Sequence, residues 1–167
     1  TPNLNIKREI NDSGITLNIS QLINNKKSCL PIPIRISLID ENGVFVKFKL
    51  NNSDFNYEHV YLLTKSEDNV KVTANGTNLI PSILRGFSAP IKLETDLKIN
   101  EYIHILKFDN DSYNRWDAIQ NLYLDCYFNN TTIKLLTKSL RDLLLDKKIN
   151  FTLMALFLEL PSREAYE

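Results

Sequence analysis

Hydrophobic and polar positions alternate along much of residues 1–95. The alternation is clearest at 15–20 (ITLNIS), 32–38 (IPIRISL) and 44–50 (VFVKFKL), and shorter runs follow at 59–64, 70–72 and 79–84. A period of two is typical of strands with one buried and one solvated face. We therefore expect three sets of residues to face a core: Ile15, Leu17 and Ile19; Ile32, Ile34, Ile36 and Leu38; Val44, Val46, Phe48 and Leu50.

Turn-forming residues separate these runs. They stand at 12–14 (Asp-Ser-Gly), 42–43 (Asn-Gly) and 75–76 (Asn-Gly), and Asn-Gly between two alternating runs favours a tight hairpin. About six to eight short strands without helical segments between them predict an antiparallel, immunoglobulin-like β-sandwich. Pro33, with Pro31 before it, indicates that the strand at 32–38 begins at a sheet edge.

After residue 95 the apolar positions recur with the period of a helix. The predicted helices cover 100–108, 114–128, 132–148 and 149–160. We expect Asp111 or Ser112 to cap the second helix. The expected buried stripe of that helix is Trp116, Ile119, Tyr123 and Cys126 or Tyr127.

The last two predicted helices are rich in leucine and phenylalanine. Four leucines form the expected buried stripe of the third: Leu136, Leu140, Leu143 and Leu144. The fourth is apolar on most of its circumference, so we expect it to be well covered. A further helix is expected to begin at Pro161 and Ser162.

The change of period divides the chain into two predicted domains. Residues 1–95 form the β-sandwich, and 96–167 form the N-terminal part of a truncated helical domain. Four short helices cannot easily close a core of their own, so the helical part should continue beyond this chain. Met154 is the only methionine, which also leads us to expect a fragment of a longer protein.

Charge and cysteine content exclude some classes of protein. Twenty basic and twenty acidic residues give a net charge of zero, so nothing attracts the chain to nucleic acid or to an anionic membrane. No apolar run reaches the roughly 20 residues that cross a bilayer, and no signal peptide is evident. Cys29 and Cys126 lie in different halves and are best interpreted as free thiols of an intracellular protein.

Candidate catalytic chemistry is sparse. His59 and His104 are isolated, one in each half, and no HExxH or Cys-x-x-Cys pair is present. The four glycines are scattered singly and open no phosphate-binding loop. Ser88 has neither a nearby histidine nor a nucleophile elbow. We expect no catalytic, cofactor-binding or metal-ligating residue in this chain.

Two motifs stand in order on either side of the predicted boundary. They are "PSILRGFSAPIKLE" at 81–94 and "DSYNRWDAIQNLYL" at 111–124. Together they resemble the bacterial-type aminopeptidase N family, the zinc-dependent alanyl aminopeptidases. In that family a β-sandwich third domain ends in a segment like LRGFSAP, and an NRWDA stretch lies in an early helix of the C-terminal domain. The likeness extends over the whole chain, including "IPIRISLIDENG" and "LRDLLLDKKINFTLMALFLELPS".

The resemblance implies a β + α fold, an immunoglobulin-like sandwich followed by the first helices of an all-α superhelical domain. It also implies a cytoplasmic, monomeric parent enzyme that removes N-terminal residues from peptides. In the family, two histidines of HExxH and a later glutamate hold zinc, a glutamate is the general base, and a GAMEN-like loop holds the substrate amine. None of these has a counterpart here, so zinc belongs to the parent enzyme and not to this chain.

The partners implied by the resemblance are the catalytic domain and the rest of the helical domain of the same polypeptide. The chain would then act as a spacer and inter-domain scaffold. Arg85, Phe87, Arg115 and Trp116 are candidates for contacts near the domain junction. Two alternatives stay open: an independent immunoglobulin-like protein-binding module with a helical extension, and a scaffold derived from the enzyme without its activity.

Overall fold

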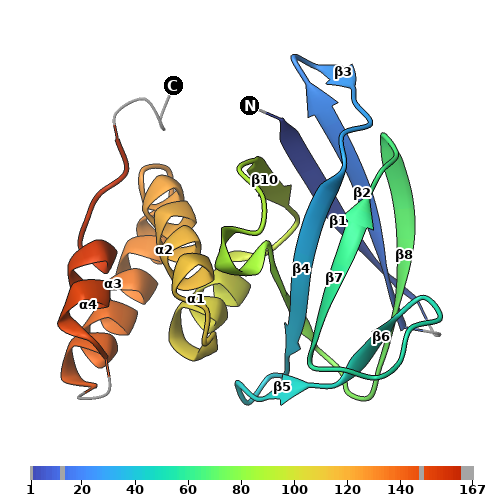
Figure 1. Cartoon of the computed structure of the whole chain (residues 1–167). Coiled ribbons are helices and arrows are strands. Elements are labelled where there is room, and N and C mark those ends of the chain that lie inside the picture. Colours follow the sequence, from blue (N-terminus) through green and yellow to red (C-terminus); the bar gives the residue numbers. More distant parts are fainter. Residues whose placement is uncertain (1, 12–13, 147–148, 163–167) are drawn as a thin grey trace. The chain divides into compact units, whose positions relative to one another are not determined.

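A computed structural model describes residues 2–11, 14–146 and 149–162 (Figure 1). The chain divides into two compact units, Thr1–Asp96 and Leu97–Glu167. Three sequence predictions fall wholly or partly outside the described residues: the turn at 12–14, the end of the third helix at 147–148, and the helix expected after Pro161.

The first unit is a sandwich of two β-sheets. In the larger sheet the strand order is β10-β1-β2-β8-β6, with β3 beside β2; in the smaller it is β5-β4-β7, with β9 also paired to β4. The larger sheet comprises β1 (Asn3–Asn11), β2 (Gly14–Ile23), β3 (Lys26–Lys27), β6 (Phe48–Leu50), β8 (Glu67–Ala74) and β10 (Lys92–Thr95). The smaller comprises β4 (Ile32–Ile39), β5 (Phe45–Val46), β7 (Glu58–Leu63) and β9 (Ile80–Ile83). The predicted sandwich is confirmed.

The alternating positions of β2 and β4 face a common core, as predicted. Leu17, Ile19, Ile34, Ile36 and Leu38 are each at most 2% exposed. Leucine, isoleucine, valine and phenylalanine side chains from both sheets pack against them. Burial of apolar surface of this kind contributes about 25 cal/mol per Å² and is the main stabilising term of such a sandwich.

The run at 44–50 is two strands instead of one, which corrects the prediction. Val46 pairs with Leu38 in the smaller sheet, whereas Phe48 pairs with Ala74 in the larger, so the chain crosses between the sheets at Lys47. The inner faces of both sheets line the same core, and inward alternation therefore continues across the crossing. Val44, expected in the core, is 58% exposed.

Val44 is exposed because it belongs to the β4–β5 turn. Asp40 Oδ1 accepts hydrogen bonds from the backbone N–H groups of Asn42 (2.9 Å) and Val44 (2.8 Å). Gly43 has φ +82°, a conformation that favours glycine. The turn predicted at Asn42-Gly43 is confirmed.

The last strand departs from the predicted antiparallel pairing. β10 pairs in parallel with β1, from Asn3 opposite Lys92 to Ile6 opposite Thr95. Just after β10, Asp96 accepts hydrogen bonds from the backbone N–H (2.9 Å) and the Nε (2.8 Å) of Arg8. The sandwich therefore ends on a strand whose exit is held by a charged contact to β1.

Pro33 lies where the smaller sheet has a strand on one side only. Residues 32–35 of β4 pair with β7, and β9 joins on the other side only from Ile36 onward. A proline without a backbone donor is tolerated at such a position. The predicted edge start of this strand agrees with the register.

The second unit contains four helices in its described residues. They are α1 (Ile99–Phe108), α2 (Ser112–Cys126), α3 (Asn130–Leu145) and α4 (Phe151–Phe157). Asp111 caps α2 as predicted, because its Oδ1 accepts from the backbone N–H of Asn114 (2.9 Å). None of these helices has the length and apolar character that a bilayer span needs.

The buried faces of α2 and α3 differ from the predicted stripes. On α2 the buried residues are Asn114, Ala118, Ile119 and Leu122. Trp116 and Tyr123 are only half-buried, and the Tyr123 hydroxyl donates to the Phe157 carbonyl (2.7 Å). Aromatic side chains with a polar end are often placed at a border of this kind. On α3, Leu136 and Leu143 are buried, whereas Leu144 is 57% exposed.

α4 is not well covered by the described residues, which corrects another prediction. Met154 and Phe157 are buried, but Phe151 is 94% exposed and Leu160, just beyond the helix, is 68% exposed. An apolar surface of this extent usually marks a contact with another element.

Two glycines with similar backbone angles provide a test of the fold. Gly14 (φ +127°) and Gly76 (φ +126°) both adopt a conformation that alanine resists. A Cβ on Gly14 would lie 2.7 Å from the Val72 carbonyl oxygen, whereas on Gly76 it would lie 3.3 Å from a Leu79 methyl group. Both alanine variants should lose about 1–3 kcal/mol of unfolding free energy from backbone strain. Gly14→Ala should lose more, because a backbone atom of β8 must move. Denaturant unfolding measures the two free-energy losses. Equal losses would contradict the close contact between Gly14 of β2 and the Val72 carbonyl of β8.

Candidate functional site

The histidines and other potential ligands form no catalytic or metal centre in the described residues. His59 Nε2 lies 2.8 Å from the Phe48 carbonyl oxygen, and the His104 ring packs 4.7 Å from that of Phe108. No group of three or more His, Cys, Asp or Glu side chains in the described ranges could hold a metal ion. The residues present therefore do not fit the zinc site that the resemblance implies for the parent enzyme.

The turn after β9 is the most unusual backbone of the sandwich. It comprises Leu84, the short 3₁₀ helix Arg85–Phe87, and residues 88–90. Leu84 (φ +57°), Gly86 (φ +61°) and Phe87 (φ +51°) all lie in the left-handed region. For leucine and phenylalanine this conformation costs about 1–2 kcal/mol each. Strain of this kind persists only where surrounding contacts hold it in place.

A buried arginine supplies the main contact. The Arg85 side chain is 8% exposed, and its Nε lies 2.9 Å from Glu58 Oε2. Arg85 Nη1 donates to Ser82 Oγ (2.8 Å), and the guanidinium lies 5.2 Å from the centre of the Phe45 ring. The turn is thus fixed to β9, β5 and β7 at once.

Glu58 joins this arginine to a second one. Its other oxygen, Oε1, accepts from Arg35 Nη2 (2.7 Å) and Arg35 Nε (3.2 Å). The Arg35 backbone N–H in turn donates to Ser88 Oγ (3.3 Å). We call Arg35, Glu58 and Arg85 the arginine–glutamate cluster. It connects β4, β7 and both ends of the turn.

The two arginines of the cluster determine the protonation state of Glu58. Burial alone would raise the pKa of this carboxyl, but hydrogen bonds and charges from Arg35 and Arg85 outweigh burial and lower the pKa below its usual value. A carboxylate with a lowered pKa stays ionised and suits a structural ion pair. It is a poor general base near neutral pH.

The four predicted junction residues have different surroundings. Arg85 is buried inside the sandwich unit, whereas Phe87, two residues on, is 48% exposed. In the helical unit, Arg115 Nε donates to the Leu106 carbonyl (2.8 Å), and the Trp116 ring lies 5.9 Å from that of Tyr113. Contact at a domain junction stays a prediction for all four.

Sequence analysis missed Glu58 and Arg35. Both occupy outward positions of their strands, where a charged residue is unremarkable, and only the register of β4 against β7 brings them together. The one indication in the sequence is that Arg85 and Ser88 are the polar members of LRGFSAP (84–90), whose other members are turn-forming or apolar.

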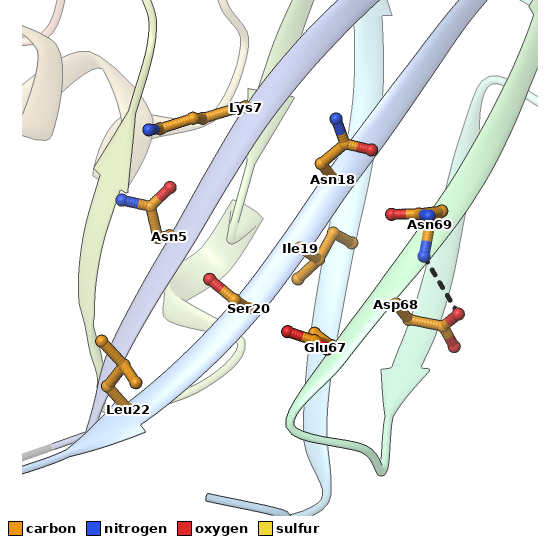
Figure 2. A pocket seen from close by; sticks show the side chains of 9 residues that line it. All are labelled: Asn5, Lys7, Asn18, Ile19, Ser20, Leu22, Glu67, Asp68 and Asn69. Carbon is orange, nitrogen blue, oxygen red and sulfur yellow. Dashed lines mark hydrogen bonds between the residues drawn. The ribbon is translucent and has the colours of Figure 1, made fainter. Parts of the chain in front are cut away.

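A polar hollow of about 550 Å³ lies on the outer surface of the larger sheet (Figure 2). Lys7, Asn18 and Asn69 occupy one row across β1, β2 and β8, and Asn5, Ser20 and Glu67 the next. Glu67 pairs with Lys27 (2.9 Å), and the backbone N–H of Asn69 donates to Asp68 Oδ1 (3.0 Å). Ser20 lies opposite Glu67 in the register, but no hydrogen bond joins the two side chains. The arrangement suits a solvated sheet surface.

Comparison with known families assigns the chain. The family described as "Domain of unknown function (DUF3458) Ig-like fold" matches residues 1–96. The chain belongs to the DUF3458 family. A second family, described as DUF3458_C with ARM repeats, matches residues 99–167. The β + α class, with an Ig-like domain before ARM-like helical repeats, is thereby confirmed.

Relatives of this DUF3458 chain carry the name that the resemblance suggested. It is 28% identical to Aminopeptidase N of Escherichia coli, over 97% of this chain and 20% of that protein. It is 33% identical to Aminopeptidase N of Haemophilus influenzae, over 59% of this chain and 11% of that protein. The chain thus spans about a tenth to a fifth of the length of these relatives.

A solved structure supports the same relationship. The crystal structure of Legionella pneumophila aminopeptidase A in complex with aspartic acid matches 96% of this DUF3458 chain and 18% of that chain, with a TM-score of 0.75 and 25% identity. The likeness to the aminopeptidase N family is confirmed.

Glu58 provides a test of the arginine–glutamate cluster. Glu58→Gln removes the carboxylate that contacts both the buried Arg85 and Arg35, and we expect a loss of about 2 kcal/mol of unfolding free energy at pH 7. The pKa of Glu58 is lower in the folded chain, so its contribution is complete above the ordinary value of 4.5 and is lost as the pH falls through the folded value. The difference between variant and wild type should therefore shrink as the pH falls below 4.5, as measured by denaturant unfolding at pH 7 and at an acidic pH below 4.5.

Glu67→Gln is the matched control. It breaks the Lys27–Glu67 pair, whose side chains are 66% and 64% exposed, and should cost less than about 0.5 kcal/mol at either pH. Equal losses of unfolding free energy from the two substitutions would show that the arginine–glutamate cluster does not stabilise the sandwich unit.

Proposed function

We propose that this chain is a non-catalytic part of a longer zinc metallo-aminopeptidase, in which it acts as a spacer and inter-domain scaffold. The observation that carries the proposal is the extent of the likeness to Escherichia coli Aminopeptidase N. That likeness runs over 97% of this chain but over only 20% of the relative. Most of the relative therefore lies outside the shared region, and the reaction is expected there.

The chemistry of the described residues supports this division. A zinc hydrolase needs protein ligands, an open coordination position and a base within hydrogen-bond reach. The two histidines in the described ranges contact Phe48 and Phe108 instead. We assign zinc and the hydrolysis of peptides to the rest of a cytoplasmic parent protein, and no step of the reaction to a residue of this chain.

The helical unit favours the scaffold over an independent binding module. A self-contained module should bury its apolar side chains, yet Phe128 and Phe151 are 80% and 94% exposed. Units of helical repeat proteins stack on their neighbours and bury such faces between them. The match to ARM repeats is consistent with this organisation. We propose that further helices of the same polypeptide cover α3 and α4.

The parent activity has a direct test. The complete gene product should hydrolyse an aminoacyl anilide and contain about one zinc per active site, whereas the 167-residue chain should do neither. Anilide hydrolysis and metal analysis on both proteins measure this. An inactive, zinc-free complete protein would instead support a scaffold derived from the enzyme, and an active 167-residue chain would refute the proposal.

Phe87 tests the scaffold role in the complete protein. If its ring is buried at a domain junction there, Phe87→Ala should lower stability by about 1–2 kcal/mol from lost apolar burial. Tyr57→Ala is the matched control, because Tyr57 is 50% exposed and Phe87 48% in the structure. Thermal unfolding of the complete protein compares the two. Equal, small effects would make Phe87 an ordinary surface residue.

A further inference from the structure

A polar residue occupies an inward position of β2. Leu17 and Ile19 face the core, and alternation along the strand places Gln21 on the same face. Gln21 is 0% exposed. Burial of a side-chain amide is unfavourable unless its donors and its acceptor are hydrogen-bonded. A glutamine at this position therefore needs partners of matching chemistry inside the sandwich.

The side chain of Gln21 finds these partners in two segments that cross between the sheets. Its Nε2 donates to the carbonyl oxygens of Leu30 (2.8 Å) and Lys65 (2.8 Å). Its Oε1 accepts from the backbone N–H of Leu30 (3.1 Å). Leu30 belongs to residues 28–31, which lead from β3 in the larger sheet to β4 in the smaller, and Lys65 to residues 64–66, which lead from β7 back to β8. One amide thus contacts both crossing segments.

The backbone of Gln21 contacts the same two crossing segments. Its N–H donates to the Ser66 carbonyl (2.9 Å), and its carbonyl accepts from the Ser28 N–H (3.2 Å). The two side-chain contacts with Leu30 combine one donor and one acceptor of a planar amide, as a residue of a neighbouring strand would. Gln21 is therefore paired with both crossing segments through its side chain and its backbone.

We propose that Gln21 is a conformational lock, a residue that selects the path of both crossing segments and so fixes how the two sheets are connected where β2 leads into β3. Apolar contacts between the sheets are non-directional, so the core alone does not determine the course of these segments. The buried amide does, because any other course leaves its donors or its acceptor without a partner. Buried polar groups fix one conformation in this way in other proteins. All the groups involved lie within the sandwich unit, so the inference is independent of the proposed function.

The lock needs two donors and one acceptor at the end of a side chain of this length. Methionine has a similar length but no donor, and an ionised glutamate has acceptors only. An ionised carboxylate at this position would face the carbonyl oxygens of Leu30 and Lys65. Gln21→Met and Gln21→Glu therefore test the hydrogen bonds separately from the volume of the side chain.

The wild-type chain provides a test without any substitution. Both Nε2 protons of Gln21 are donated at a buried site, whereas Nε2 of Gln120 donates to the Glu159 carbonyl (3.0 Å) at an exposed one. We expect the Gln21 side-chain protons to exchange with solvent at least about tenfold more slowly than those of Gln120. Hydrogen exchange followed by NMR measures both rates in the 167-residue chain, and equal rates would overturn the proposal.

Gln21→Met should open the crossing segments locally. The Leu30 amide should exchange at least about tenfold faster than in the wild type, measured relative to the amides of Leu17 and Ile19 on the same strand. Trypsin should cleave after Lys65 at least about tenfold faster, because that peptide bond joins two carbonyl groups that Gln21 contacts. Hydrogen exchange and limited proteolysis below the unfolding transition measure the two effects.

Gln21→Glu should give a pH-dependent result. Burial against two carbonyl oxygens should raise the pKa of the introduced carboxyl in the folded chain above its ordinary value of about 4.3. Two lysines beside the crossing segments are already paired, Lys27 with Glu67 (2.9 Å) and Lys65 with Asp68 (3.4 Å). The neutral acid keeps one donor, and stability is lost as the pH rises and the acid ionises. The denaturation midpoint of the variant relative to the wild type should therefore fall between about pH 5 and about pH 7.

Gln120 is the matched control for both substitutions. Because its side chain donates at an exposed site, Gln120→Met and Gln120→Glu should leave the protection of the Leu30 amide and the pH dependence of the midpoint as in the wild type. Unchanged Leu30 protection in Gln21→Met, or a Gln21→Glu midpoint that follows the wild type at both pH values, would overturn the proposal. If neither variant folds, the exchange of the wild-type Nε2 protons decides between the two outcomes.

Discussion

The turn after β9, through which the chain leaves the smaller sheet, depends on one carboxylate that serves two arginines. Glu58 stands on β7, yet its oxygens hold Arg35 on β4 and Arg85 in the turn after β9. Without this charge the turn would contain two left-handed non-glycine residues and a buried arginine that has lost the carboxylate of Glu58. Breaking such a pair leaves an uncompensated buried charge, which costs more than the intact pair gains. The cluster therefore acts mainly by excluding other conformations of the turn.

A second charged contact completes the path of the chain out of the sandwich. After the turn, the buried Ala89 and Ile91 carry the chain across the core, and β10 then joins the edge of the larger sheet beside β1. Directly after this strand, Asp96 forms an ion pair with Arg8, whose side chain is 9% exposed. The segment that leaves the sandwich is thus fixed at its start by Glu58 and at its end by Arg8. Two charged contacts at the ends of this segment are consistent with the proposed spacer role.

The sequence predicts elements well and the relations between them poorly. Alternation identified β2 and β4 because each has one apolar face, and the Asp111 cap of α2 follows from its side-chain chemistry. Alternation could not show that the chain crosses from one sheet to the other at Lys47, because both sheets present their inner faces to one core. Nor could it give the parallel β1–β10 pair or the meeting of Glu58 with two arginines, because these depend on register between segments far apart in sequence. The predicted stripe of α2 was right at Ile119 and wrong at Trp116 and Tyr123, which are apolar enough to count toward a stripe yet only half-buried.

The two units of the chain reach stability by different means. The sandwich pairs its strands through contacts distant in sequence, and apolar side chains of residues 4–91 from both sheets form one buried cluster. The helices make local contacts, and each further helix buries one face while presenting another, as in a stacked array. For α3 and α4 the presented face carries Leu144 and Phe151, both exposed. The exposed leucine and phenylalanine side chains of α3 and α4 are the surfaces that the proposed further helices would cover.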